Sequence, residues 1–155
     1  MTVQVEVIYS ISRKDNPSEE SFKKWVKAAM GERKKSGSVV INIIDEVEMT
    51  TLNNTYRKKN KPTNVLSFPS QLPEPFRGDE LGDIAICASV VEREAIEQKK
   101  EPTAHWAHMV VHGVLHLLGY DHESEEDAIK MERIETDILN EMGFKDPFLG
   151  HIDHE

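Results

Sequence analysis

The stretch PTAHWAHMVVHGVLHLLGYDH, residues 102–122, is the part of the sequence that most constrains the fold. Proline suits the first position of a helix, and the residues that follow are mostly apolar up to Gly119. A glycine after the last apolar residue is typical of a helix end. We therefore expect a central apolar helix from Pro102 to about Leu118, followed by a sharp turn.

The segments around this helix show alternating strand and helix patterns. Period-two and β-branched runs predict strands at residues 3–9, 39–44, 65–68 and 81–87. Helical spacing and capping signals predict further helices at residues 16–31, 50–58, 89–100 and 124–142, the first with Asn16 as its N-cap. Residues 69–80 are rich in proline, glycine and charge and predict a loop.

This order of elements predicts an α/β (α+β) fold. Short connections between strands and helices favour a single mixed sheet of about four strands covered by helices. With 155 residues, of which 38% are hydrophobic, we expect one domain spanning residues 1–155. The single cysteine, Cys87, excludes an internal disulfide and is expected to be a small buried apolar residue.

The sequence lacks membrane and export patterns. No apolar run approaches the roughly 20 residues that a membrane span needs. The N-terminal residues lack the basic start and apolar stretch of a signal peptide. We therefore expect a cytoplasmic protein.

The negative charge of the chain is concentrated at its C-terminal end. The net charge is −9, and residues 121–155 contain 3 Lys and Arg against 12 Asp and Glu, so residues 1–120 sum to zero. Binding to a nucleic acid leans on basic residues, and it remains possible only if the acidic part faces away. The last helix is interpreted as a solvated acidic face that could meet a basic partner. Of the two basic runs, residues 33–35 are interpreted as solvated surface, while residues 57–61 stay candidates for contact.

Three histidines have the spacing of metal ligands. On a helix, His112 and His116 project from the same face one turn apart, and the turn at Gly119 brings His122 within reach of the same ion. Three neutral imidazoles leave coordination positions open on a divalent ion, which is typical of catalytic and not of structural zinc sites. Such an ion lowers the pKa of water toward neutrality, as hydrolysis requires.

Gly113 favours phosphodiester cleavage over peptide hydrolysis. Zinc peptidases with this histidine spacing carry a glutamate directly after the first histidine, where it serves as general base. Here that position is Gly113, which disfavours peptide hydrolysis. Cleavage of a phosphodiester depends less on such a base, because an ion and a cation can stabilise the charges that develop. A glycine inside a helix also indicates that something approaches the backbone there or that helices pack closely.

The stretch from His112 to His122 resembles the HGxLHLxGYDH motif of the YbeY family, bacterial metal-dependent endoribonucleases of rRNA maturation. Other segments resemble the family in the expected order: LNNTYR at residues 52–57, PTNVLSF at 62–68 and LGDI at 81–84. The resemblance covers residues 50 to 122. Asn64 departs from it, because the family commonly has aspartate there.

The resemblance implies a function and a site. The activity would be cleavage of single-stranded RNA, in 16S rRNA 3′-end maturation and ribosome quality control. One zinc ion would be held by His112, His116 and His122, which with the functional arginine Arg57 would be the catalytic residues. Partners would be rRNA, ribosomal particles and ribosomal or GTPase assembly proteins, without a membrane.

Several interpretations stay open beside this one. The function could instead be that of a non-catalytic ribosome-assembly factor with a structural zinc site, or of another zinc hydrolase. Asp83 is expected to face solvent more than to orient an imidazole, and Asp121 either caps the turn or holds His122. The weaker candidates are Lys59 and Lys61 for RNA backbone contacts, His105 and His108 as packing or cleft-lining residues, and His151 and His154 in an exposed tail.

Overall fold

The computed structural model of the chain describes residues 2–145, so His151 and His154 lie outside the described residues. Four strands form one sheet in the order β1-β2-β4-β3. The parallel strands are β1 (Val3–Tyr9), β2 (Gly37–Ile44) and β4 (Glu80–Cys87), and β3 (Val65–Pro69) pairs antiparallel with β4 at the edge. The predicted single mixed sheet in an α+β fold is thus confirmed.

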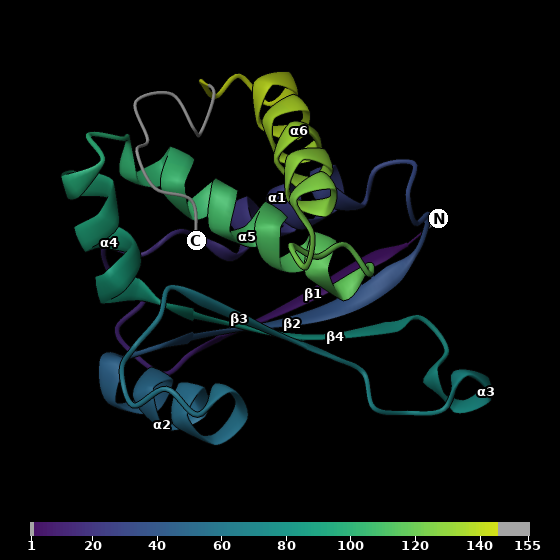
Figure 1. Ribbon diagram of the computed structural model, residues 1–155, viewed down its shortest axis with the longest axis horizontal. Coiled ribbons are helices and arrows are strands. Elements are labelled where there is room, and N and C mark those ends of the chain that lie inside the picture. The colour runs from purple at the N-terminus through teal and green to yellow at the C-terminus, as the bar shows by residue number, and fades with distance from the viewer. Residues whose placement is uncertain (1, 146–155) are drawn as a thin grey trace.

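The helices lie on both faces of this sheet (Figure 1). One face carries α1 (Glu19–Met30), α5 (Pro102–Leu117) and α6 (Glu125–Glu141), while α2 (Glu46–Arg57) covers the other. The helix α4 (Ala88–Glu97) lies at the end of the sheet, and the short α3 (Glu74–Arg77) lies in the β3–β4 connection. None of the helices within residues 2–145 is long and apolar enough to cross a membrane.

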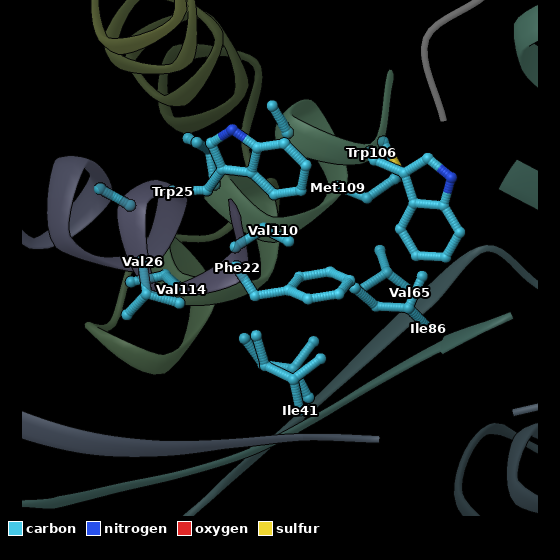
Figure 2. Close-up of a cluster of buried hydrophobic side chains, with 14 of the residues drawn as sticks. Phe22, Trp25, Val26, Ile41, Val65, Ile86, Trp106, Met109, Val110 and Val114 are labelled. Carbon is cyan, nitrogen blue, oxygen red and sulfur yellow. The ribbon is translucent and has the colours of Figure 1, made fainter. Parts of the chain in front are cut away.

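The main hydrophobic core lies between the sheet, α1 and α5. Phe22 is central to it, with its ring edge-on to Trp25 at 5.5 Å and to Trp106 at 5.8 Å between ring centroids (Figure 2). A smaller cluster under α2 includes Met49, Leu66 and the buried Cys87. Most residues of α5 are buried, which confirms its predicted central place.

Some predicted boundaries differ from the structure. Asn16 is not the cap of α1, because the Ser18 hydroxyl accepts from the Ser21 backbone N–H at 3.2 Å and the Asn16 side chain instead donates to the Ser12 carbonyl. The helix α2 begins four residues earlier than predicted, since the Asp45 carboxylate accepts from the Glu48 N–H at 2.8 Å. The segment predicted as loop, residues 69–80, contains α3.

Candidate metal centre

The C-terminal half of α5 is pressed against the sheet at Gly113. A Cβ atom at this position would lie 3.0 Å from Cγ2 of Ile84 and 3.3 Å from Oγ of Ser67. The Ser67 hydroxyl donates to the Gly113 carbonyl at 2.9 Å. The predicted close approach to the backbone is therefore confirmed, and no side chain large enough to act as a general base fits here.

The turn after α5 brings the third histidine back to the helix. Gly119 has φ of 102°, a conformation that favours glycine, and the Tyr120 N–H donates to the Leu115 carbonyl at 3.0 Å. The His122 ring then stacks on His112 at 4.9 Å between centroids. The Asp121 carboxylate accepts from the Glu123 N–H at 3.2 Å. Asp121 therefore caps this turn, which is one of the two roles predicted for it.

The three imidazoles are close enough to share one ion. Their candidate ligand atoms all lie within 4.8 Å of one another, and Nε2 of His112 lies 3.0 Å from Nε2 of His116. Zinc–nitrogen bonds of about 2.0–2.1 Å allow nitrogens at such separations to bind the same ion. All three rings are half-buried, so one side of the cluster stays open to solvent. The residues present therefore fit a metal ion with open positions.

The environment keeps at least two of these rings neutral. Burial, together with the neighbouring His112 and His122, lowers the pKa of His116 to about 4. Burial also lowers the pKa of His122, with His112 acting in the same direction. Neutral imidazoles are the form that binds a metal ion, so no proton must be removed from these rings near pH 7.

A buried carboxylate, Glu135, lies behind the cluster and was missed by the sequence analysis. Its Oε2 lies 3.1 Å from Nδ1 of His112, and its Oε1 lies 2.7 Å from Nε2 of His108. Burial alone raises the pKa of Glu135, but hydrogen bonds and charge from the two rings outweigh it and hold this pKa at about 2. The interpretation of the last helix as wholly solvated is therefore wrong at this position. The available signal was the place of Glu135 within the apolar stripe of Met131 and Ile138.

His105 and His108 are buried, which agrees with their predicted role in packing, and they lie outside the group of three clustered histidines. Nε2 of His105 lies 2.9 Å from Oε1 of Glu94. The Asn64 amide donates to both oxygens of the same carboxylate, at 3.0 and 3.2 Å. Asn64 therefore belongs to this pair in the N-terminal half of α5 and not to the histidine cluster.

The structure does not bring Arg57 to the three histidines. Arg57 is the last residue of α2, on the face of the sheet opposite α5, and it is exposed (Figure 1). Its side chain makes no hydrogen bond or ion pair within residues 2–145. The preceding ring, Tyr56, packs against Phe68 of the edge strand β3 at 5.0 Å between centroids. Lys59 and Lys61 follow as exposed residues.

Asp83 lies away from the cluster. It is exposed, while its neighbour Ile84 faces the core beneath α5, so the two side chains point to opposite faces of the sheet. Partial burial raises the pKa of Asp83, a hydrogen bond with Asn42 opposes this, and the charges of Glu80 and Glu6 add to it. The prediction that Asp83 faces solvent is confirmed.

Comparison with known proteins agrees with this geometry. The model of the family described as "Endoribonuclease YbeY" matches residues 8–143, a range that includes all three histidines. The solution structure of TM1509 from Thermotoga maritima resembles the chain with a TM-score of 0.59 and 26% identity, over 90% of this chain and 92% of that one. With a match over most of its length, the chain belongs to the YbeY family of endoribonucleases.

Proposed function

We propose that this protein is a single-strand-specific, metal-dependent endoribonuclease that acts in the cytoplasm on 16S rRNA, in 3′-end maturation and ribosome quality control. The observation that supports this most is the cluster of three half-buried imidazoles whose candidate ligand atoms lie within 4.8 Å. Its open side allows both an ion and a phosphodiester to bind. Family membership supports RNA as the substrate.

In this proposal His112, His116 and His122 hold one zinc ion. Three nitrogen ligands suit zinc and leave a position for substrate. When bound, the ion supplies a Lewis acid that lowers the pKa of water and stabilises negative charge on a phosphoryl oxygen. The protein contributes neutral ligands, and Gly113 lets the helix that carries His112 and His116 approach the sheet closely.

Arg57 is the proposed phosphate-binding residue. Its guanidinium is exposed, and an arginine can bind two phosphate oxygens at once. The edge strand β3 connects the two regions, since Ser67 bonds α5 on one face and Phe68 packs against Tyr56 of α2 on the other. An RNA strand that crosses this edge would meet both Arg57 and the histidine cluster. Lys59 and Lys61 would add contacts to its backbone.

The surface charge suits a ribosomal setting. The excess of acidic residues lies in residues 121–155, which include α6, and the basic run at residues 57–61 begins at the end of α2, on the face of the sheet opposite α6. Separate surfaces for RNA and for basic ribosomal or GTPase assembly proteins fit this distribution. Ribosomal particles are therefore the proposed partners.

The experiment is cleavage of one labelled RNA, as a single strand and as a duplex, by purified protein. We expect cleavage of the single strand only, its loss with a chelator, its return with zinc, and a loss of about 100-fold or more in His116→Ala. Arg57→Ala should also lose activity, whereas Arg13→Ala, which removes an exposed arginine paired with Glu19, should not. Equal cleavage by the wild type and His116→Ala would mean that the activity comes from a contaminant.

The same variant separates the alternative functions. A non-catalytic assembly factor with a structural zinc site would bind ribosomal particles without RNA turnover, and His116→Ala would melt far below the wild type. A catalytic site predicts little loss of stability in that variant. A peptidase would digest casein, and the packing of Gly113 against Ile84 and Ser67 argues against this activity.

A further inference from the structure

Glu135 is a buried carboxylate that joins the histidine cluster to the interior of the protein. It comes from α6, is 1% exposed, and uses each carboxylate oxygen for a different histidine of α5. Its only ion-pair partners within residues 2–145 are these two rings, and no lysine or arginine is among them. A buried carboxylate without donors is strongly unfavourable, so the two ring N–H groups are what hold it in place.

The contact with His112 determines which of its nitrogens carries the proton. A carboxylate only accepts hydrogen bonds, so Nδ1 of His112 must be the donor at 3.1 Å. A neutral imidazole has one N–H, which leaves Nε2 of His112 with a free lone pair. That Nε2 is the atom that lies 3.0 Å from Nε2 of His116.

The second oxygen of Glu135 is fixed by His108. The distance from Oε1 to Nε2 of His108 is 2.7 Å, shorter than the contact with His112, and His108 is itself buried. The carboxylate is therefore held by His108, which lies one turn of α5 before His112. A carboxylate held in this way has little freedom to let the His112 ring rotate.

We infer that Glu135 is a positioning residue for the metal centre, holding the His112 ring in the Nδ1–H form that directs Nε2 toward the ion, with His108 as its anchor. This inference rests on the proposed function, because it takes the histidine cluster to be an ion site. Carboxylates that hold ligand histidines in this way raise metal affinity by about 10- to 100-fold. A purely structural role, in which Glu135 only joins α6 to α5, would leave metal affinity unchanged.

The chain offers a matched control for the test. Glu94 pairs with His105 of α5 at 2.9 Å, and His105 is not one of the three clustered histidines. Glu135→Gln and Glu94→Gln make the same change in shape and charge at two carboxylate–histidine pairs. Zinc affinity would be measured for both variants by competition with a chromophoric chelator, beside thermal melting of the zinc-free proteins.

We expect Glu135→Gln to weaken zinc binding by about 10- to 100-fold and Glu94→Gln by less than about 3-fold, even if both variants melt lower than the wild type. Long-range ¹⁵N–¹H NMR spectra of the zinc-free wild type should show His112 protonated at Nδ1. This second measurement needs no variant and still applies if Glu135→Gln does not fold.

Two results would overturn the inference alone: zinc binding by the wild type that Glu135→Gln does not weaken, or a His112 ring protonated at Nε2 in the wild type. Failure of the wild type itself to bind zinc would overturn the proposed metal centre, and this inference with it. The first pair of results leaves the proposed endoribonuclease function standing, so the two failures are distinguishable.

Discussion

The two halves of α5 use the same pairing of histidine and carboxylate for different ends. In the N-terminal half, Glu94 accepts from the buried His105 and from Asn64, and Asn64 also binds the backbone at the start of β3. Glu135 accepts from His108 near the middle of the helix and from His112 in the C-terminal half, and this network ends at a half-buried ring beside two others. The pairing itself therefore does not define a functional site.

What differs is where the other nitrogen of the ring lies. Nδ1 of His105 is buried and has no hydrogen-bond partner among the described residues. Nε2 of His112 lies on the open side, 3.0 Å from a second ring nitrogen. We call the half with His105 the closed half and the half with His112 the open half. Variants in the closed half should therefore affect stability alone, and variants in the open half should affect ion binding and reaction. Variants in each half test this difference.

The largest effect is expected at Gly113, where the open half of α5 meets the sheet. Gly113→Glu would place a charged side chain within about 3 Å of Ile84 and Ser67, and we expect it to lower the free energy of unfolding by at least about 3 kcal/mol. Urea denaturation measures this. In the control Gly113→Ala, a gain of about 1 kcal/mol in helix propensity offsets part of the clash, so the net loss should be about 0–2 kcal/mol. A stable Gly113→Glu that hydrolyses peptides would show that this position faces the ion.

The contrast between the halves also marks what the sequence could predict. The strands, α5 and the spacing of His112, His116 and His122 depend on residues within one or two turns of each other, so periodicity and spacing predict them. The contact of Glu135 with His112 spans 23 residues and depends on how α6 packs on α5, which no local pattern states. A glutamate inside an apolar stripe was the only local indication.

Arg57 also shows how far local sequence patterns can predict the site. The basic character of residues 57–61 is a local property and was predicted, but the face of the sheet that α2 covers depends on strand order. The start of α2 at Glu46 also differs from the prediction, because the capping role of Asp45 was not recognised beside the preceding strand. The sequence marks Asn64 only as a departure from the family motif, because its partner Glu94 lies 30 residues away.

A smaller effect is expected from Asn64→Asp, which tests whether the closed half is purely structural. The Asn64 amide donates to both oxygens of Glu94, so the substitution brings two carboxylates together. Like charges raise the pKa of the introduced carboxyl in the folded protein above its value of about 4 in the unfolded chain. The loss of stability is therefore absent below about pH 4 and grows as pH rises through the pKa of the folded protein. We expect about 1–3 kcal/mol near pH 7 from urea melts at pH 4 and pH 7. A change in zinc affinity without a change in stability would contradict the comparison.

The smallest effect is expected at Asp83, which belongs to neither half and gives a baseline. Partial burial raises its pKa, so the folded state binds a proton more tightly than the unfolded state, and stability falls as pH rises from about 4 through the raised value. Asp83→Asn keeps an acceptor for Asn42 and removes this fall. Because solvent screens an exposed group, the gain near pH 7 should be only about 0.5 kcal/mol or less. Melting curves across pH 3 to 8 measure it, and zinc affinity should match the wild type. A variant that instead lost zinc binding would place Asp83 in contact with the metal centre and remove the distinction between the two faces of the sheet.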